Sequence, residues 1–288
     1  MDVVLDVGAE LGESPVWSAD EGLLYWVDIG GQAVHAFDPD SGHDRSWPIT
    51  GRPSALARTA DPQRLLVAVE NELVWLDLES GDSTPWVMLE PPRPGVRLND
   101  GRCDPAGRFW IGGMYDPTSA NRFDAHLHRV EPDGSFTTVR DQVGCANGLA
   151  FSPDGTVMYW ADTLHSLVWA YDYDVDTGEQ RNERVFLDFG PLPGKPDGAC
   201  IDEAGCYWIA CVGGSAVIRA TPGGEVDRIV EVPVLRPTMP AFGGADLATL
   251  FITSIAARDP EADGPGPHGA ILAFAPGVRG LPEPAFAG

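Results

Sequence analysis

The run LLYWVD at residues 23–28 decides the fold, because five variants of it follow along the chain. The variants are RLLVAV (64–69), RFWIGG (108–113), VMYWAD (157–162), CYWIAC (206–211) and TLFITS (249–254). In every repeat an Asp stands six residues before the hydrophobic centre of the run: Asp20–Trp26, Asp61–Val67, Asp104–Trp110, Asp154–Trp160, Asp202–Trp208 and Asp246–Ile252. The centres are 41, 43, 50, 48 and 44 residues apart, which is the length of a four-stranded antiparallel blade with its turns. Six such repeats predict an all-β fold, a six-bladed β-propeller.

A second alternating run follows each of these runs after a loop, for example AVHAFD at 33–38 and LVWAYDYD at 167–174. Aromatic and β-branched residues suit packed strands, and helical periodicity is scarce, so we expect almost no helix. The first run, VVLDVG at 3–8, has no blade of its own, and the last repeat ends soon after AILAFAP at 270–276. We therefore expect the N-terminal strand to complete the last blade and close the ring, with residues 1–288 forming one domain.

The composition argues against several classes of protein. With 19 basic and 43 acidic residues the formal net charge is -24 at pH 7, which repels nucleic acids and anionic membranes. No apolar stretch approaches the roughly 18 residues of a membrane span, and the N-terminus lacks the basic region of a signal peptide. The five cysteines form no CxxC pair, so reduced and mostly buried thiols are expected. We expect a cytoplasmic protein, a monomer or weak homo-oligomer, whose partner is a small molecule.

Acids and amides recur at one position of the repeat. When the repeats are aligned on their first turn, the residue five positions before the turn is Glu13, Ser54, Asn99, Asn147, Asp197 and Met239 in chain order. The first strand of each propeller blade lines the central channel, so equivalent positions form a ring about the axis. Taken singly, Asn-Asp-Gly, Asn-Gly and Pro-Asp-Gly are more often ordinary turns than ligands. The shared offset before four apolar strands favours a site where the four acids and amides converge.

Two carboxylates in this ring raise an electrostatic problem. Glu13 and Asp197 would repel each other in a narrow channel, and one of them would take up a proton unless a cation lay between them. A set of oxygen ligands without Cys or His favours a hard ion such as Ca²⁺, Mg²⁺ or Mn²⁺ over a structural zinc. Catalytic Zn²⁺ and Fe²⁺ also accept mixed carboxylate and amide ligands, so they stay open. The sequence therefore predicts a divalent metal site on the axis.

Long motifs spread over nearly the whole chain resemble those of a known family. They are LGESPVW (11–17), RLNDGRCDPAGRFWIGGM (97–114), ANGLAFSPDG (146–155) with YWADT (159–163), the segment from RVFLDF to KPDGACIDEAG (184–205), and RPTMPAFGGADLATLFIT (236–253). In this order they resemble the signatures of the senescence marker protein/gluconolactonase family, also called regucalcin-like proteins. The resemblance implies a six-bladed propeller with one divalent metal ion at its axis, Ca²⁺ foremost, and hydrolysis of sugar lactones.

The same resemblance implies roles for single residues. Glu13, Asn147 and Asp197 match metal ligands of the family, and Asp197 also matches the proposed general base. Arg97 and Asn99 match residues that contact the lactone. Asn99 is near enough to the expected ion to be a fourth ligand or to act through water.

One loop departs from the family pattern. Several relatives have a Glu in the loop after the GTM-like motif that binds sugar hydroxyls, and Asn121 or a neighbour stands there in this chain. Topology also places this loop, 114–125, over the site, because the second strand of each blade returns to the face where the ring residues begin. The loop 255–269 lies on that face too, where it is either a lid or a floppy surface loop. We expect Asn121 to contact the sugar without the charge of the family Glu.

The expected reaction is hydrolysis of an aldonolactone, such as glucono-, xylono-, arabinono- or galactonolactone, to the aldonic acid. The metal would act as a Lewis acid, and Asp197 would take a proton from the attacking water. A phosphotriesterase or aryl-esterase-like hydrolase would use the same ring with a more apolar pocket. A non-catalytic calcium-binding propeller would keep the ring without turnover. Arg97 argues against pure ion binding, because a cation site gains nothing from an adjacent guanidinium.

Overall fold

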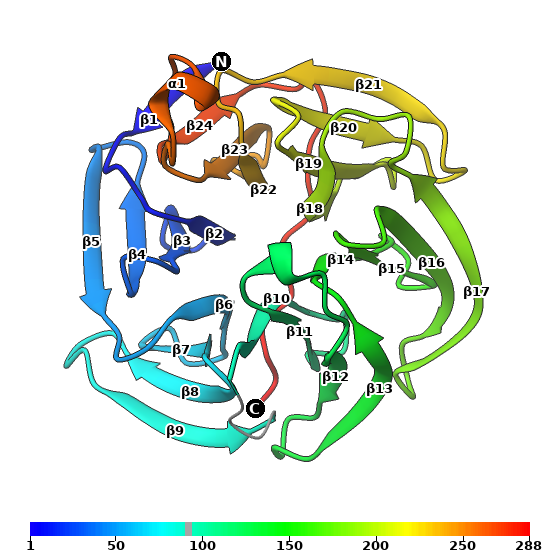
Figure 1. Ribbon diagram of the computed structural model, residues 1–288. Helices are drawn as coiled ribbons and strands as arrows, with labels where there is room; N and C mark the ends of the chain where they lie inside the picture. Colours follow the sequence, from blue (N-terminus) through cyan, green and yellow to red (C-terminus); the bar gives the residue numbers. More distant parts are fainter. Residues whose placement is uncertain (90–93) are drawn as a thin grey trace.

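Six four-stranded antiparallel sheets surround a central channel in the computed structural model, which describes residues 1–89 and 94–288 (Figure 1). We number these blades 1 to 6 along the chain. Blade 1 holds β2 (Gly12–Ser18), β3 (Leu23–Asp28), β4 (Ala33–Asp38) and β5 (His43–Pro48); blade 2 holds β6 (Pro53–Arg58), β7 (Arg64–Val69), β8 (Glu72–Asp77) and β9 (Ser83–Met88); blade 3 holds β10 (Val96–Cys103), β11 (Phe109–Tyr115), β12 (Ala125–Val130) and β13 (Phe136–Val143). Blade 4 holds β14 (Ala146–Phe151), β15 (Val157–Asp162), β16 (Leu167–Asp174) and β17 (Glu179–Asp188); blade 5 holds β18 (Lys195–Ile201), β19 (Tyr207–Val212), β20 (Ala216–Ala220) and β21 (Val226–Glu231); blade 6 holds β22 (Pro237–Gly243), β23 (Thr249–Ser254), β24 (Ile271–Phe274) and β1 (Asp2–Leu5). The predicted six-bladed β-propeller is confirmed.

The start of the chain completes the last blade. β1 pairs antiparallel with β24, with Val3 opposite Leu272. A further backbone hydrogen bond joins the Ala9 amide to the Gly269 carbonyl oxygen at 2.9 Å. The first and last repeats are therefore held together by a strand ladder, which closes the ring as the sequence predicted.

In blades 3 and 5 the recurring Asp is fully buried and holds the turn between the first two strands through hydrogen bonds from backbone amides. In blade 5 Asp202 is fully buried, and its Oδ1 accepts hydrogen bonds from the Ala204 and Cys206 backbone amides at 3.0 and 2.9 Å. Its Oδ2 accepts from Nε1 of Trp208 at 2.9 Å and from Nε of Arg219 at 2.8 Å. This contact between Asp202 and Trp208 gives the six-residue spacing a structural cause in that blade. The equivalent tryptophans Trp26, Trp110 and Trp160 are likewise buried in the core.

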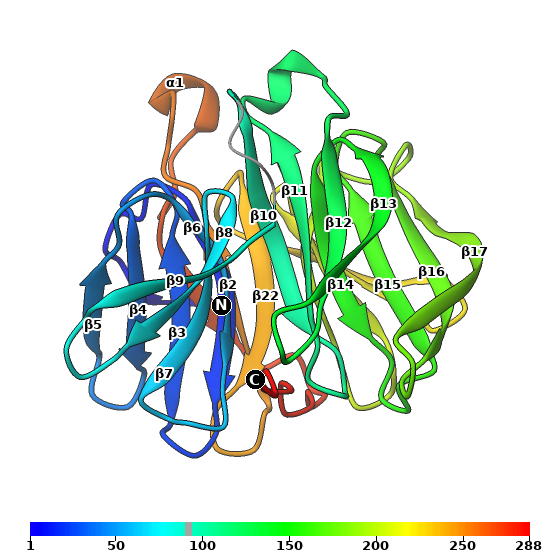
Figure 2. The same cartoon turned by 90° about the horizontal axis from the view of Figure 1, so that it is seen from below.

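The two faces of the ring differ in what covers them. Figure 2 shows α1 (Pro260–Asp263) and the loop after β11 rising above one face, while the C-terminus lies at the other. We call these the upper and the lower face. The loop after β11 contains the 3₁₀ helix η1 (Thr118–Ala120). Within the described ranges, α1 and η1 make up the helical content, as expected for a fold with almost no helix.

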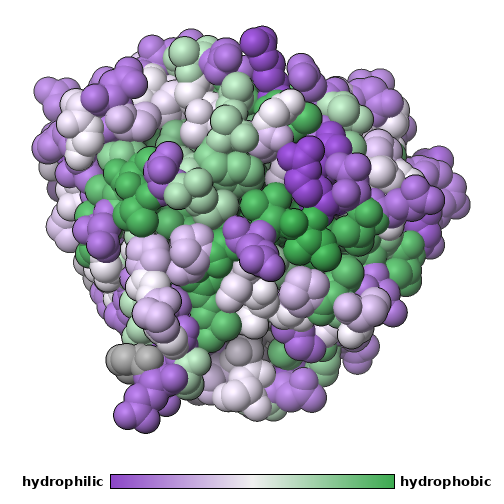
Figure 3. Space-filling model, turned by 90° about the horizontal axis from the view of Figure 1, so that it is seen from above, coloured by the Kyte–Doolittle hydropathy of each residue, from purple (hydrophilic) through white to green (hydrophobic). Residues whose placement is uncertain are grey.

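The outer surface of the ring carries both hydrophobic and hydrophilic residues. Figure 3 shows a band of hydrophobic residues between hydrophilic ones on one side of the ring. Single exposed apolar side chains, such as Val226 and Ile229 on β21, are normal for protein surfaces.

All five cysteines are free and buried. The helices in the described part of the chain lack the length and apolar character needed to cross a bilayer.

Candidate active site

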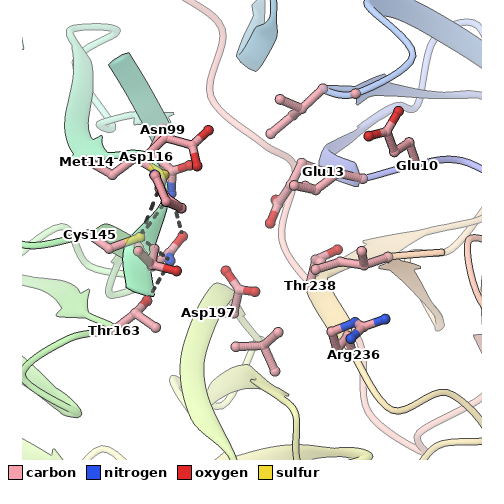
Figure 4. Close-up of a pocket in the computed structure, with 18 of the residues that line it drawn as sticks. Glu10, Glu13, Asn99, Met114, Asp116, Cys145, Thr163, Asp197, Arg236 and Thr238 are labelled. Atoms are coloured by element: carbon pink, nitrogen blue, oxygen red, sulfur yellow. Dashed lines mark hydrogen bonds between the residues drawn. The ribbon is translucent and has the colours of Figure 1, made fainter. Parts of the chain in front are cut away.

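A cavity of about 520 Å³ opens at the upper mouth of the central channel (Figure 4). Its size is within the range of pockets that hold small molecules. Glu13, Arg97, Asn99, Asn147 and Asp197 all line this cavity. They come from the first strands of four blades, β2, β10, β14 and β18. The sequence offset therefore identifies residues that the fold brings together.

β-bulges beside the ring positions help to direct these side chains. The strand register shifts between Glu13 and Val16, between Asn147 and Ala150, and between Pro196 and Ala199. The first strands of blades 2, 3 and 6 are irregular at the corresponding place. A bulge adds local twist and re-aims a side chain, so it suits a position that must face the channel. The turn-like sequences at the ring therefore lie within strands and do not form the hairpin turns that such sequences usually make.

The bulge in blade 4 explains the glycine after Asn147. Gly148 has a φ of 61°, a left-handed conformation that disfavours other residues. A Cβ there would also collide with the hydroxyl oxygen of Tyr207, which donates a hydrogen bond to the Gly148 carbonyl oxygen at 2.7 Å. The Asn-Gly pair is thus fixed by backbone geometry and close packing next to a channel-facing amide.

Neither carboxylate of the site forms an ion pair with a basic side chain among the described residues. Oε2 of Glu13 accepts a hydrogen bond from the Ser14 backbone amide at 3.0 Å. Burial, together with the charge of Asp100, raises the pKa of Glu13 to about 8. Burial and then the charge of Glu13 raise the pKa of Asp197 well above its usual range. Both pKa shifts mean that this pocket disfavours two uncompensated negative charges.

The donor set of the pocket fits one divalent cation. Glu13 and Asp197 offer carboxylate oxygens, and Asn147 offers an amide oxygen on the wall of the same cavity. Such oxygen donors are those that hard cations take, and a cation would relieve the repulsion described above. Within residues 1–89 and 94–288, no three His, Cys, Asp or Glu side chains are grouped so that they could hold a metal ion. A metal site here therefore depends on Asn147 as the third protein ligand.

A row of hydrogen bonds connects blades 3, 4 and 5 across the floor of the cavity. Nη1 of Arg97 donates to Oδ1 of Asn99 at 2.9 Å, and Nδ2 of Asn99 donates to Oδ1 of Asn147 at 3.2 Å. Nδ2 of Asn147 donates to Oγ1 of Thr163 at 2.7 Å. The Thr163 hydroxyl in turn donates to the Pro196 carbonyl oxygen at 2.8 Å. The row fixes the orientation of both amides, and it ends at the residue before Asp197.

A second network holds Arg97 from the side of the η1 loop. Asp116 accepts hydrogen bonds from Nη1 of Arg52 at 2.8 Å and from Nε of Arg97 at 3.5 Å. Arg52 also forms a two-pronged ion pair with Glu70, both contacts at 2.9 Å. Burial lowers the pKa of the Arg97 guanidinium, and the charge of Asp116 opposes this shift. Blades 2 and 3 thus hold Arg97 as an oriented donor on the cavity wall.

Asn121 lies above the cavity region but is not among the residues that line it. It follows η1 in the left-handed conformation, with φ at 50° and ψ at 50°, and its side chain is exposed. Pro117 and Thr118 of the same loop do line the cavity. The contribution of Asn121 to sugar recognition stays a prediction.

The loop after β23 overhangs the cavity from the other side. Residues 255–258 line the cavity, and α1 follows them. Asp263 forms an ion pair with Arg236, which lies just before β22, and accepts hydrogen bonds from the backbone amides of Arg258 and Asp259 at 2.6 and 3.2 Å. Nη2 of Arg236 also donates to the Ala256 carbonyl oxygen at 2.9 Å. These contacts fasten the loop to blade 6 in the observed position.

Several residues of the site did not emerge from the sequence argument. Thr163 and Arg236 lie inside the quoted motifs YWADT and RPTMP, so the signal was present without an assigned role. Arg52 and Asp116 occur in a loop and at a strand end, where no repeat offset marks them. The two remaining positions of the ring, Ser54 and Met239, do not line the cavity, whereas the neighbouring Thr238 does.

Comparisons with known proteins place this geometry in context. The family model described as SMP-30/Gluconolactonase/LRE-like region matches residues 11–256. A 6-deoxy-6-sulfogluconolactonase of Pseudomonas putida is 36% identical over 282 residues, which cover 96% of this chain and 95% of that protein. An L-arabinolactonase of Azospirillum brasilense is 35% identical, covering 94% of this chain and 90% of that protein. The solved structure of a calcium-binding protein, regucalcin, from Agrobacterium tumefaciens matches with a TM-score of 0.92 at 31% identity, covering 99% of this chain and 96% of that one.

Proposed function

The chain belongs to the SMP-30/gluconolactonase family, and on that premise we propose that it hydrolyses a sugar lactone to the aldonic acid with one bound divalent metal ion. Relatives that are named lactonases support the reaction class. One observation carries the proposal for the site. Two buried carboxylates, Glu13 and Asp197, share a small-molecule cavity with Asn147 and the oriented Arg97, and neither carboxylate has a protein cation as partner among the described residues.

The proposed chemistry divides between the metal and the side chains. The ion, held by Glu13, Asn147, Asp197 and either directly or through water by Asn99, would supply Lewis acidity at the lactone carbonyl. The oxygen of the attacking water bonds to the carbonyl carbon, and a carboxylate oxygen of Asp197 takes the proton that this water loses. The bond between that carbon and the ring oxygen then breaks, and the ring oxygen takes up a proton, from Asp197 or from water, and leaves as a hydroxyl group.

Arg97 and Asn99 orient the sugar in this scheme. Both line the cavity and are hydrogen-bonded to each other, so their donors are fixed before a substrate arrives. Nη1 of Arg97 also donates to the Leu98 carbonyl oxygen at 2.9 Å, which holds the guanidinium plane. Pre-positioned donors stabilise negative charge that develops on the carbonyl oxygen without reorganising during the reaction.

The proposal also specifies the ion and the sugar. We propose Ca²⁺ first, with Zn²⁺, Mn²⁺, Mg²⁺ or Fe²⁺ as alternatives, and a glucono-, xylono-, arabinono- or galactonolactone as the basic sugar skeleton. We also propose a cytoplasmic protein acting as a monomer or weak homo-oligomer, with residues 1–288 as one lactonase domain and no nucleic acid or membrane partner. The five free thiols and the net charge of -24 support this location.

A pH-indicator screen of five- and six-carbon aldonolactones with each ion in turn tests the function. Hydrolysis releases a proton, so a metal-dependent colour change with at least one sugar lactone is the expected result. Paraoxon and an aryl acetate in the same plate test the phosphotriesterase or aryl-esterase alternative. Turnover of these compounds without sugar-lactone turnover would replace the proposal. Metal binding without turnover of any compound would favour a calcium-binding propeller instead.

A further inference from the structure

Arg258 differs from the other arginines of this acidic chain. Among the described residues, every other arginine side chain contacts an acid, a carbonyl oxygen or an aromatic ring. The backbone amide of Arg258 donates a hydrogen bond to Asp263, but its exposed guanidinium contacts no acid, carbonyl oxygen or aromatic ring. Acidic residues outnumber basic ones by 43 to 19, so a guanidinium without an ion pair is unexpected on composition alone.

The unpaired guanidinium belongs to the wall of the active-site cavity. Arg258 lines it together with Ala256 and Ala257. Its backbone amide donates to Asp263, whose ion pair with Arg236 fastens the loop to blade 6. The position of the Arg258 backbone is therefore set by the fold, and the long side chain is free to reach a ligand in the cavity.

The other arginines of the cavity are already neutralised. Arg52 pairs with Glu70 and Asp116, and Arg97 shares Asp116. Arg236 pairs with Asp263. Within the described ranges, Arg258 is thus the one cavity arginine that forms no ion pair.

From these contacts we infer that the lactone bears an anionic group, remote from its carbonyl, that pairs with Arg258. The inference rests on the proposed lactonase function and names the class of its substrate: an aldonolactone with a carboxylate, phosphate or sulfonate on a distal carbon. A guanidinium binds each of these groups through paired hydrogen bonds. Because Arg258 is exposed, the pair acts as a selectivity device and contributes little to catalysis itself.

The test compares gluconolactone with the same lactone bearing a carboxylate, a phosphate or a sulfonate at carbon 6. The wild-type enzyme at low ionic strength should show a higher kcat/KM for at least one charged lactone than for the neutral one. Arg258→Gln should reduce this ratio by about fivefold, the upper range for an exposed ion pair, and added salt should reduce it in the wild type. Arg258→Lys should keep most of the preference. Arg181→Gln, an exposed arginine on the outer strand β17, serves as the matched control and should behave as wild type.

The outcomes separate this inference from the function on which it rests. A wild-type enzyme that hydrolyses gluconolactone but disfavours or ignores all three charged lactones overturns the inference and leaves the lactonase intact. The same conclusion follows if Arg258→Gln lowers kcat/KM equally for charged and neutral lactones. If the enzyme hydrolyses none of the four lactones and none of the aldonolactones of the pH-indicator screen, the proposed function fails, and the inference fails with it.

A different observation concerns Thr163, whose hydroxyl links the side chain of Asn147 to the backbone carbonyl of Pro196, the residue before Asp197. Its proton is donated to the Pro196 carbonyl oxygen, so its oxygen must accept the hydrogen bond from Asn147. Only the NH₂ end of the Asn147 amide can make that bond, which turns Oδ1 away from Thr163. The geometry points to Thr163 as a positioning residue that presents the Asn147 amide oxygen to the metal ion of the proposed function.

Calcium titration by calorimetry on metal-stripped protein tests this role without requiring turnover. Thr163→Val keeps the shape but cannot accept the bond, and it should weaken calcium binding by about tenfold, the lower range for residues that orient metal ligands. Thr163→Ser should restore the wild-type affinity. In an Asn147→Asp background both ends of the side chain are oxygen, so Thr163→Val should there weaken binding much less.

The same variants distinguish a general structural role of Thr163 from a specific role in calcium binding. Equal losses from Thr163→Val in the wild-type and the Asn147→Asp backgrounds would assign Thr163 a general structural role and overturn the inference. Unchanged calcium affinity in Thr163→Val would do the same. A wild-type protein that binds no divalent ion would instead overturn the proposed metal site and this role together.

Discussion

The two ends of the central channel differ in how the carboxylates on one strand are paired. At the upper end of β18, Asp197 faces a cavity and has no cationic partner within the described residues. Just beyond the lower end of the same strand, Asp202 accepts hydrogen bonds from Trp208, Arg219 and two backbone amides. One carboxylate is satisfied by its own blade, whereas the other is left for a ligand. Blade 5 thus places a structural Asp and a candidate functional Asp within six positions.

The chain's own tail covers the lower end. Nη1 of Arg102 is 3.2 Å from Oε2 of Glu283, and the Phe286 amide donates to the Arg58 carbonyl oxygen at 2.8 Å. Phe286 is fully buried and packs against the rings of Trp75 and Trp86. A smaller cavity of about 340 Å³ remains there, but its Arg102 and Glu283 are paired with each other. Chemistry is therefore expected at the upper end, where the charges are unbalanced.

Removal of metal should break this contrast most strongly. A chelator should abolish lactone hydrolysis, because the two upper carboxylates then lack the cation that balances them. Stability should also fall, by about 3 kcal/mol if the ion was present at a hundred times its dissociation constant. Activity and thermal unfolding with chelator, and after restoring Ca²⁺, measure both effects. If neither quantity changes, the ring is not a metal site.

Amide substitutions at the two aspartates should have opposite consequences. Asp197→Asn keeps one coordinating oxygen but cannot accept the proton, so kcat should fall by at least roughly 10²-fold. Its metal affinity should fall less than that of Glu13→Ala. Asp202→Asn removes a buried partner of Arg219 and should cost about 3 kcal/mol of stability, while the folded fraction keeps its turnover. Near-native kcat in Asp197→Asn at saturating metal would reassign the general base.

The metal-free protein should lose stability as the pH rises. The folded-state pKa of Glu13 lies near 8, above its ordinary value of 4.5, so the protonated form is favoured in the fold. Such a group adds stability below pH 4.5 and loses it progressively up to about pH 8. Allowing for water in the cavity, we expect a loss of about 2 kcal/mol.

Urea unfolding of metal-stripped protein between pH 5 and pH 8 measures this slope. The pKa of Asp197 is raised in the same direction, by burial and in part by the charge of Glu13, so the two carboxylates titrate as a pair and the slope belongs to both. Glu13→Gln should flatten the slope, and saturating Ca²⁺ should remove it, because the ion favours the ionised carboxylates. A slope that is unchanged in Glu13→Gln would show that other groups cause it.

The difference between periodic and non-periodic parts explains what could be predicted. Glu13, Asn99, Asn147 and Asp197 were found because six copies of one blade place equivalent residues at one radius and height. Arg52 and Asp116 meet across two blades through loop geometry that no offset encodes. The tail that delivers Glu283 to Arg102 lies outside the repeat altogether. The spacing of a repeat predicts where its residues lie in the fold. The positions of loops and tails depend on contacts that are seen only in the folded chain.

The smallest expected effect concerns Asn121, which stands where several relatives have Glu. It lies on the η1 loop whose Pro117 and Thr118 line the upper cavity, so it could reach a sugar only from the rim. If it contacts hydroxyl groups, Asn121→Glu should change the relative kcat/KM of pentonolactones and hexonolactones by about 2- to 10-fold, as expected for one hydrogen bond. Metal affinity should stay the same, because the side chain is outside the ring. Aliphatic lactones, which lack those hydroxyls, are the matched control: an equal change for them would mean that the loop governs access and does not recognise the sugar.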